Sequence, residues 1–526
     1  AGFALSVSGL LTVGTDAKLI CGGGTVTAGS TSISGEVSCG TSLGITWLGT
    51  TGDGLWSTAG NWTNNTTPGA SDIAYFNSQC TNCNSTVNSA LSVKGVVMAS
   101  TYTGIVTQGA GNAITVGTSG WTVAGGTFTG SDATISINGT LAISSGTYTA
   151  TSATTSIGLS GGPCSTNTPL NVTAGTFNHG NGRLKVYGGR TVGQSCNATA
   201  QLIFPVGFTV YDFELSSHIT QGGWRSNATA PSATTITVAH HFYDYGHGYS
   251  FTVDLKGDLY TNRNENVNTG VVRVSGTTDQ YYTYTSGSAG SSTIRIDKAS
   301  GTFQPAGGVT ELTAWSLELL QGAFTAPSGN LNLGATTSSA TNHNALLVSS
   351  GTSFSTNGGT IRFNLARDAG ASASTVSTIS VPAGFAFNNV EMNGNAPHYA
   401  FFDDVNSSTT LVVNGNLVFA GKRNNANWDV LGNITVNGYA NSGTGTIRAA
   451  GSTNQTVTGT STAWFSDFAI ASTGGIVTLA GTLSFSRNFT YTSGTVDAGT
   501  STVSFYAETG YTNVLTPGVM TFNNVK

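Results

Sequence analysis

The sequence predicts an all-β protein built as a parallel β-helix, in which the chain winds through stacked turns of short strands and carries loop insertions. Apolar and polar residues alternate with a period of two, as in 135–143 and 410–419, whereas helical periodicity is nearly absent. Glycine or Asn-Gly interrupts this alternation, and the units between the interruptions recur at a rather constant pitch. Tandem β-sandwich domains are the alternative fold.

A short token sets that pitch. Gly-Thr followed by an aromatic residue occurs at Gly126, Gly146, Gly175 and Gly301, and Gly-Ala-Phe follows at Gly322. Two of the gaps between tokens are 20 and 21 residues. A turn of this length accommodates three short strands, and successive turns stack about 4.8 Å apart. We expect glycine at the corners, where the backbone needs positive φ, and like side chains in ladders along the stack.

Composition excludes several function classes. Charged residues are 8% of the chain and hydrophobic residues 38%, and glycine fills 72 of 526 positions, so the chain is neither disordered nor highly charged. A net charge of −5 with 18 Lys and Arg residues leaves no basic stripe for nucleic acid or for an anionic membrane surface. No run of 18 apolar residues exists, so no transmembrane helix is expected.

The cysteines indicate an oxidising, extracellular setting for a secreted protein. Their number is even, Asn-x-Ser/Thr sequons are frequent, and Ala1 reads as the product of signal cleavage. The candidate disulfide cysteines are Cys21 and Cys39, Cys80 and Cys83, and Cys164 and Cys196. Free thiols are the alternative. A zinc site is disfavoured because the Cys-x-x-Cys at Cys80 has no second pair at suitable spacing.

Four segments are predicted along the chain. Residues 1–46 are N-terminal strands and a candidate assembly segment, and residues 47–182 are a tryptophan-rich module followed by regular turns. Residues 183–300 read as an irregular, aromatic and histidine-rich insertion or subdomain. Residues 301–526 return to regular turns and end in an open repeat.

The tryptophan-rich module carries a family resemblance. It reads W-x-G, G-x-W-S, N-W, P, D and F through Trp47, Gly49, Trp56, Trp62, Pro68, Asp72 and Phe76. With Gly104 and Gly126 after it, the module resembles large repetitive bacterial surface proteins with autotransporter-like β-strand repeats, best over residues 46–160. The resemblance implies an exported β-helix with adhesive or structural work, and it assigns no catalytic residue.

The most enzyme-like cluster is His240, His241, Asp244 and His247, because His and Asp at such spacing can bind a divalent metal. On a strand, however, His240 and His241 would point to opposite faces, which favours an aromatic interface or ordinary loop packing over a metal. Polysaccharide chemistry needs clustered carboxylates, and the sole adjacent acidic pair is Asp403-Asp404. We therefore predict a protein that is not an enzyme and has no cofactor, with a polysaccharide-degrading enzyme as the weaker alternative.

A glycan-binding surface adhesin is the main alternative function. Exposed aromatic rings stack on sugars, and six residues could supply such a patch or a subunit interface. They are Trp224, Tyr243, Tyr245, Tyr281, Tyr282 and Tyr284.

The two ends of the chain read like halves of one repeat. Residues 24–34 match 494–504 position by position, residues 4–13 share the pattern of 476–483, and 521–526 repeats a signature seen at 465–468. We therefore predict a structural subunit of an extracellular bacterial filament or surface fibre, which adds to itself head to tail by strand complementation. The candidate assembly residues are Phe3, Leu5, Val7, Leu10, Leu11, Val13, Phe522 and Val525. A window cut from a longer repeat protein would give the same match.

Overall fold

A computed structural model describes most of the chain. The described residues are 4–13, 18–20, 25–33, 36–38, 44–158, 167–187, 198–216, 226–230, 234–245, 248–262, 270–285, 292–334, 343–365, 375–394, 400–404, 410–420, 423–437, 439–440, 443–460, 464–506 and 514–526. They contain many short strands, two 3₁₀ turns, η1 (Ala59–Asn61) and η2 (Thr63–Asn65), and no α-helix. The chain divides into two compact units, Ala1–Ala233 and Thr234–Lys526.

The first unit begins with four strands that pair in parallel among themselves. They are β1 (Ala4–Val13), β2 (Lys18–Ile20), β3 (Thr25–Ile33) and β4 (Glu36–Ser38). β1 pairs with β3, and β2 pairs with β4. Each pair joins strands that lie one turn apart in the sequence, which is the connectivity of a β-helix.

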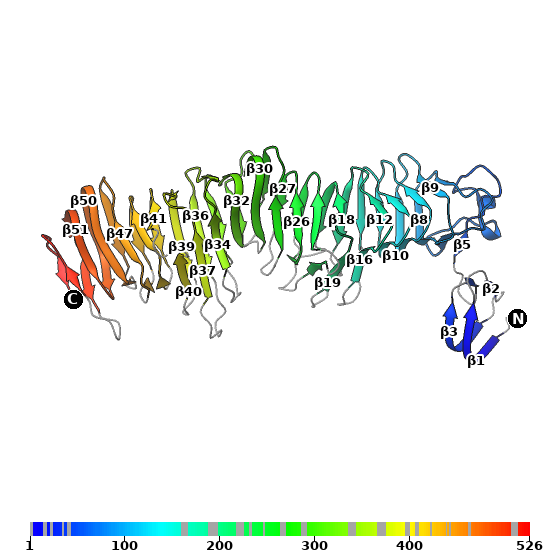
Figure 1. Ribbon diagram of the computed structural model, residues 1–526, viewed down its shortest axis with the longest axis horizontal. Helices are drawn as coiled ribbons and strands as arrows, with labels where there is room; N and C mark the ends of the chain where they lie inside the picture. The colour runs from blue at the N-terminus through cyan, green and yellow to red at the C-terminus, as the bar shows by residue number, and fades with distance from the viewer. Residues whose placement is uncertain are drawn as a thin grey trace. The chain divides into compact units, whose positions relative to one another are not determined.

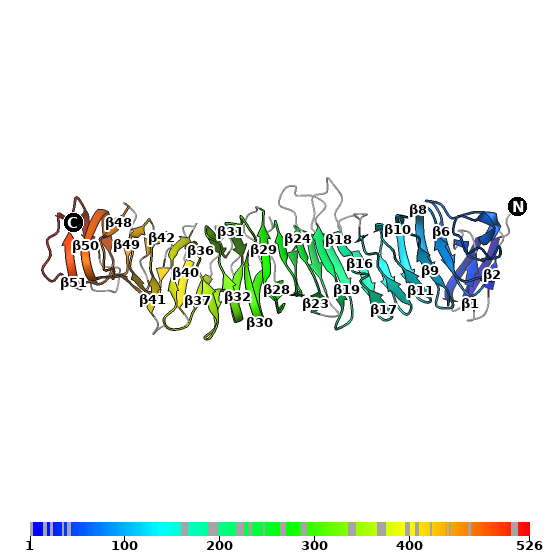
Figure 2. The ribbon, with the colours of Figure 1, turned by 90° about the horizontal axis from the view of Figure 1, so that it is seen from above.

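The rest of the first unit winds through three parallel ladders (Figures 1 and 2). One ladder contains β5 (Ile45–Thr46), β6 (Ile73–Phe76), β8 (Leu91–Met98), β10 (Ile114–Val123), β13 (Leu141–Ile143), β16 (Asn167–Val172), β19 (Ala198–Ile203) and β22 (Ser226–Thr229). A second runs from β8 and β10 through β12 (Ile135–Ile137), β15 (Thr154–Ile157), β18 (Arg183–Tyr187) and β21 (Asp212–Ser216), which follows the short β20 (Thr209–Val210). The third contains β7 (Ser85–Val87), β9 (Ile105–Gln108), β11 (Thr127–Thr129), β14 (Thr147–Thr149) and β17 (Thr176–Asn178).

The second unit continues the same construction through five ladders. The first contains β23 (Thr235–Val238), β26 (Thr252–Leu255), β28 (Val271–Val274), β30 (Thr293–Pro305), β32 (Ser316–Thr325), β34 (His343–Val348), β37 (Thr375–Ser380), β40 (Ala400–Asp404) and β43 (Arg423–Asn424). The second contains β24 (Phe242–Tyr245), β27 (Leu259–Thr261), β29 (Gln280–Tyr284), the later halves of β30 and β32, and β35 (Ser353–Ser355). The two-residue β25 (Gly248–Tyr249) also lies in this region.

The later turns of the second unit use the other three ladders. One contains β31 (Glu311–Ala314), β33 (Asn330–Leu333), β36 (Thr360–Leu365), β39 (Asn389–Gly394), β42 (Leu417–Phe419), β45 (Ile434–Val436), β48 (Gln455–Gly459) and β50 (Asp467–Phe485). The next contains β38 (Ala386–Phe387), β41 (Thr410–Val413), β44 (Asn427–Val430), β47 (Thr446–Ala449), β50, β51 (Phe489–Asp497) and β53 (Leu515–Thr516). The last contains β46 (Tyr439–Ala440), β49 (Trp464–Phe465), β50, β52 (Thr502–Phe505) and β54 (Asn524–Val525).

These pairings confirm the parallel β-helix. Every strand pair listed above is parallel, whereas the alternative of tandem β-sandwiches would require antiparallel sheets. The pitch varies more than the sequence tokens indicate: register partners in adjacent turns lie 19 residues apart at Asp429 and Arg448, and 29 apart at Arg183 and Asp212. Segment 183–300, predicted as an irregular insertion, contains described strands from β18 to β30 that pair in parallel with strands of neighbouring turns.

Alternation along each strand builds the core. On β12 the side chains of Ile135 and Ile137 are buried, and Ser136 between them faces outward. Ile135 is in register with Ile114 and Ile137 with Val116, so like side chains stack from turn to turn. Burying an aliphatic side chain of this size contributes about 1.5–3 kcal/mol, and this burial is repeated in every turn.

The aromatic residues of the Gly-Thr tokens form an interior stack. The ring centroids of Phe128 and Tyr148 lie 4.9 Å apart, and those of Tyr148 and Phe177 lie 6.0 Å apart with nearly parallel planes. Gly126 adopts φ +63°, as expected for a corner glycine. Gly146 does not adopt positive φ, but a Cβ there would lie 2.5 Å from the carbonyl oxygen of Gly126. The token glycines therefore serve close stacking as well as backbone conformation.

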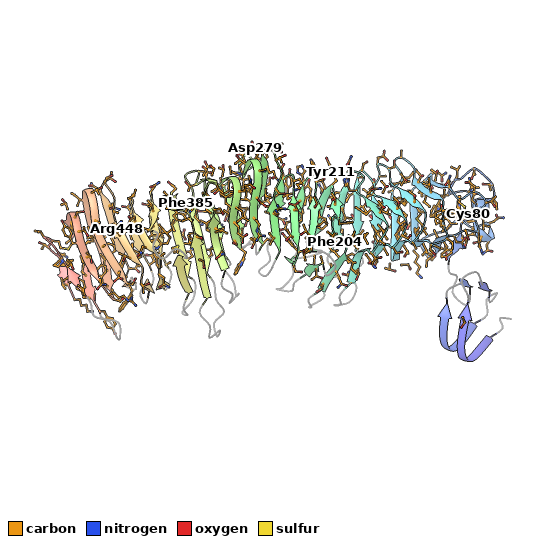
Figure 3. All side chains as sticks on the ribbon, in the orientation of Figure 1. Cys80, Phe204, Tyr211, Asp279, Phe385 and Arg448 are labelled. Carbon is orange, nitrogen blue, oxygen red and sulfur yellow. A yellow bond between two sulfur atoms is a disulfide. The ribbon has the colours of Figure 1, made fainter. Side chains whose placement is uncertain are left out.

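The few charges pair across turns. Arg448, which is labelled in Figure 3, has its Nε 2.6 Å from a carboxylate oxygen of Asp429, and Arg295 Nε lies 2.6 Å from a carboxylate oxygen of Glu318. In each pair the two residues occupy matching positions on neighbouring strands. The chain therefore uses its scarce charges as cross-turn ion pairs, which favour one register.

Candidate assembly surfaces

The last described turn carries exposed apolar side chains. β53 pairs with β51, and β54 pairs with β52 through Val525 and Val503; the described residues include no strand stacked beyond them. Leu515, Val519 and Val525 are 43%, 96% and 61% exposed. These three apolar side chains are exposed on the last described turn, and exposed strand edges are the usual basis of strand addition.

Phe522 belongs to the same turn but has a different environment. Its ring is half-buried, with its centroid 5.8 Å from Phe489 and 6.1 Å from Phe505. Phe505 lies 5.8 Å from Phe485, which stacks in turn on Phe465. Phe522 therefore partly covers the end of an interior aromatic stack, and Val525 lies beside it on the open strand.

The N-terminal candidates lie on one strand. Leu5, Val7, Leu10, Leu11 and Val13 all belong to β1, which pairs with β3 alone in the described residues. Phe3 lies outside the described residues. The four N-terminal strands therefore make a piece of β-helix with one turn already stacked on another.

The pairing of this N-terminal piece matches that of the C-terminal turns at one of two compared points. The sequence match equates Thr25 with Thr495 and Ile33 with Val503. Thr25 pairs with Ala4 as Thr495 pairs with Ile476, and Ile33 pairs with Val13 as Val503 pairs with Leu483. Between these two points the offset between paired residues falls from 21 to 20 in the N-terminal pair and rises from 19 to 20 in the C-terminal turns. The two ends therefore share the same offset only at the second point, where Ile33 and Val503 lie.

One part of the sequence match is wrong. Matching 521–526 to 465–468 equates Val525 with Phe468. Phe468 pairs with Phe489, however, and Phe489 pairs with Leu515 one turn later, so Leu515 continues the ladder of Phe468. Val525 instead continues the ladder of Leu483 and Val503. The short Phe-x-x-apolar signature occurs in two different ladders, and four residues do not distinguish them.

The aromatic candidates do not form one surface. Tyr282 is a core residue: it is fully buried, its ring packs on Phe303 and Phe324, and its hydroxyl donates to the Thr325 carbonyl at 3.1 Å. Its assignment to a glycan-facing patch was wrong, because alternation on β29 turns Tyr282 inward and Tyr281, which is 40% exposed, outward. Tyr284 is half-buried, and burial raises its pKa. Trp224 lies outside the described residues.

Tyr243 and Tyr245 lie on β24 and turn outward. The Tyr243 ring stacks on Tyr260, with centroids 4.8 Å apart and planes 12° apart, and the Tyr245 ring lies 5.9 Å from that of Tyr243. Tyr260 was not among the predicted aromatic residues. The strand register predicts the contact, because aligning Phe242 with Leu259 places Tyr260 directly over Tyr243.

The histidine cluster differs from expectation. His240 and His241 have ring centroids 3.6 Å apart, although alternation predicts opposite faces. They lie in a bend before β24 rather than on a strand, so alternation does not apply. His241 Nδ1 accepts the backbone N–H of Asp258 at 3.1 Å. The described residues contain no group of three or more His, Cys, Asp or Glu that could hold a metal ion; His247 lies outside them.

The acidic pair Asp403-Asp404 lies on β40, and its side chains lie outside the described residues. Six other carboxylates form ion pairs with arginine or lysine. They are Glu214, Asp254, Asp297, Glu318, Glu391 and Asp429.

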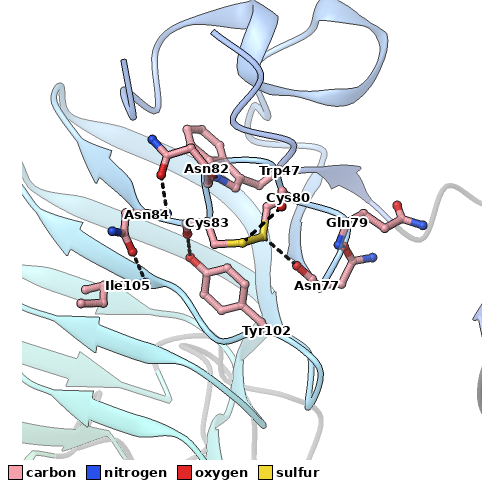
Figure 4. Close-up of a disulfide and its surroundings, with 9 residues drawn as sticks. All are labelled: Trp47, Asn77, Gln79, Cys80, Asn82, Cys83, Asn84, Tyr102 and Ile105. Atoms are coloured by element: carbon pink, nitrogen blue, oxygen red, sulfur yellow. Dashed lines mark hydrogen bonds between the residues drawn. A yellow bond between two sulfur atoms is a disulfide. The ribbon is translucent and has the colours of Figure 1, made fainter. Parts of the chain in front are cut away.

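One predicted disulfide is present (Figure 4). Cys80 and Cys83 are bonded within a single loop, with Cα atoms 5.0 Å apart. The loop is fixed from two sides: the Tyr102 hydroxyl donates to the Cys83 carbonyl, and Trp47 Nε1 donates to the Asn82 carbonyl at 2.8 Å. The disulfide-bonded loop therefore contacts both Trp47 of the tryptophan-rich module and Tyr102 further along the chain. Cys21, Cys39, Cys164 and Cys196 lie outside the described residues.

No family model matches this chain. Comparisons with curated proteins and with solved structures also find no match. Within the described ranges, no helix is long and apolar enough to cross a membrane.

Proposed function

We propose that this protein is a structural subunit of an extracellular bacterial fibre, assembled when β1–β4 of one copy extend the ladders that reach β53 and β54 of another. The observation that carries the proposal is a shared offset of 20 residues: Val13 pairs with Ile33 as Leu483 pairs with Val503. A segment with that pairing is already shaped as the next turns of the same β-helix.

Backbone pairing and the burial of apolar surface both favour the addition of one copy to another. Backbone N–H and C=O groups on the open side of β53 and β54 gain partners, as in strand addition generally. The exposed side chains of Leu515, Val519 and Val525 lose contact with water, which contributes about 25 cal/mol per Å² of apolar surface. A head-to-tail contact of this kind does not close on itself and so propagates.

The register predicts which residues meet. Leu483, Val503 and Val525 form one ladder, and Val13 and Ile33 are its counterparts in the N-terminal piece. Val13 of the incoming copy should therefore stack directly on Val525. Thr12 should point to the opposite face, because successive strand residues alternate.

Cysteine mapping tests this contact. One preparation carries Val13→Cys and a second carries Val525→Cys; the two are mixed under mild oxidation, and cross-linked peptides are identified by mass spectrometry. We expect a disulfide between residues 13 and 525 of different chains, together with fibres in electron micrographs. The matched control is Thr12→Cys, which should give little bond to residue 525.

Three results would overturn the proposal. Equal cross-linking of residues 12 and 13 would contradict the register. A 13–525 bond found only within single chains, in a double variant, would show that the two ends meet intramolecularly. Fibres with an unchanged subunit repeat after deletion of residues 2–13 would show that β1 is not the joining strand.

A further inference from the structure

Lys298 is a buried cation without a carboxylate partner among the described residues. Its side chain is 0% exposed, and its Nζ donates to three oxygens: the Gly276 carbonyl at 2.6 Å, the Thr278 carbonyl at 2.9 Å and Gln280 Oε1 at 2.6 Å. Carbonyl oxygens carry only partial charge, so they compensate the loss of hydration incompletely. Burial accordingly lowers the pKa of Lys298, while the nearby charge of Asp279 acts in the opposite direction.

The carboxamide that Lys298 contacts is equally buried and held at both ends. Gln280 is 0% exposed, and its Oε1 also accepts the backbone N–H of Gly276 at 2.8 Å. Its Nε2 donates to the Leu255 carbonyl at 3.3 Å and to the Gly257 carbonyl. The orientation of the amide is thus fixed, with its carbonyl oxygen toward two donors and its nitrogen toward two acceptors.

We propose that Lys298 and Gln280 form an intramolecular isopeptide cross-link. Nζ of Lys298 bonds to Cδ of Gln280, and the bond from Cδ to Nε2 breaks. The ammonium of Lys298 and the primary amide of Gln280 become a secondary amide, and Nε2 leaves as ammonium with the two protons that Nζ gives up. Atoms and charge balance without an oxidant or other reactant.

The surroundings suit each part of this step. Negative charge that develops on Oε1 during attack is stabilised by the Gly276 N–H, a donor that is already in place. A depressed amine pKa increases the fraction of neutral, nucleophilic lysine. Fixed contact between the two groups supplies the proximity that a slow reaction between amine and amide requires. The product also removes the buried charge.

A second buried glutamine, Gln455, is held by the same kind of hydrogen bonds but has no lysine beside it among the described residues. Gln455 Oε1 accepts the Gly451 N–H at 2.7 Å, and its Nε2 donates to the carbonyls of Val430 and Gly432. Where Lys298 Nζ reaches the Gly276 carbonyl, Ser472 Oγ reaches the Gly451 carbonyl at 2.9 Å. The hydrogen bonds that hold the glutamine therefore form with a neutral hydroxyl in place of the amine, and they do not require a lysine.

Mass spectrometry of the full chain tests the cross-link. We expect the folded protein to be lighter by one ammonia molecule, trypsin to fail to cleave after Lys298, and fragmentation to join the peptides of Gln280 and Lys298. Lys298→Arg keeps a buried cation that is not nucleophilic, so it should show the full mass. Gln455 serves as the control within the chain, and its peptide should remain unmodified.

The contrary outcomes are equally definite. An unmodified mass for folded protein after days at pH 9, with trypsin cutting after Lys298, would overturn the proposal. Loss of ammonia that maps instead to an Asn-Gly sequence would do the same, since succinimide formation there gives an equal mass change. If Lys298→Arg fails to fold, Gln280→Glu supplies the comparison, because a carboxylate resists attack by an amine.

Discussion

The side-chain oxygen of Asn416 accepts the backbone N–H of Asn433 at 2.9 Å, one turn further along the chain. Asn389 binds the N–H of Asn416 in the same way, and Asn433 binds that of Thr456. These contacts form an asparagine ladder at one corner, where each turn satisfies a donor of the next. We expect Asn416→Ala to weaken the local structure by about 1 kcal/mol, as for a typical intramolecular hydrogen bond.

Hydrogen exchange at the Asn433 amide measures this effect. Its exchange should accelerate about fivefold, which corresponds to 1 kcal/mol. Asn416→Asp keeps an acceptor oxygen of the same shape and should exchange at nearly the wild-type rate. Equal acceleration in both variants would show that the hydrogen bond is not the cause.

Gly126→Ala separates close packing from backbone strain. At φ +63°, any L side chain costs about 1–2 kcal/mol, and here a Cβ would also lie 2.4 Å from the Tyr102 ring and 2.7 Å from the Gly104 carbonyl oxygen. Gly111→Ala is the matched control, since φ is +72° and no atom lies within 4 Å of the added Cβ. Denaturant unfolding should show a clearly larger loss for Gly126→Ala. Equal losses would exclude the clash.

Trp121 provides a test of core packing. Its ring is buried, with centroids 4.5 Å from Phe128 and 5.6 Å from Tyr148, and its indole N–H has no hydrogen-bond partner among the described residues. Trp121→Ala should cost about 3–5 kcal/mol because it opens a cavity. Trp121→Phe should cost much less, because it keeps most of the packing and removes the unpaired donor. Calorimetric melting distinguishes the two, and similar losses would contradict this account.

Glu214 should make stability depend on pH in the acid range. It is 3% exposed, lies 2.9 Å from Arg183 and 2.7 Å from Lys185, and accepts the Ser216 hydroxyl at 2.6 Å. Burial alone raises the pKa of Glu214, but the contacts with Lys185, Ser216 and Arg183 outweigh it and hold the pKa below the ordinary value of 4.5. The unfolded chain therefore binds this proton more readily. The stabilisation is present above about pH 4.5 and is lost as pH falls through the lower folded pKa.

Glu214→Gln should remove that part of the acid dependence and cost about 1.5–3 kcal/mol at neutral pH, as for hydrogen bonds to charged groups. Melting temperatures from pH 3 to pH 7 measure both effects. Glu318→Gln breaks a more exposed pair and should cost less than about 1 kcal/mol. If the melting temperature of Glu214→Gln falls as steeply from pH 7 to pH 3 as that of the wild-type protein, groups other than Glu214 cause the pH dependence.

The repeat architecture could be predicted because it follows from the alternation and spacing of residues that are close in the sequence. Ile135-Ser136-Ile137 alternates in the sequence and alternates in burial, and Phe128 and Tyr148 recur at the spacing at which they stack. The expectation for His240 and His241 failed because a bend interrupts the strand there, and no single-residue signal marks it. Val525 was matched to the wrong ladder because short apolar signatures are shared by different faces of the β-helix.

Contacts between turns were the least predictable part of the candidate sites. The contact of Lys298 with Gln280 depends on how β29 and β30 stack, and Tyr260 meets Tyr243 only when their strands are aligned. The outward turn of Tyr281 and the burial of Tyr282 could have been read from alternation once the strand phase was known. The strand phase could not be predicted from the sequence, because loop length varies from turn to turn.

Each strand of the ladders bonds mainly to the turns just before and just after it, and this locality determines how the protein would respond to force. Tension on one end of a unit would peel the chain off turn by turn, so that the load falls on a few hydrogen bonds at a time. Each peeled turn of about 20–30 residues would release roughly 70–100 Å of contour length. A covalent bond between Gln280 and Lys298, which are 18 residues apart, would shorten one of those steps and leave the rest unchanged.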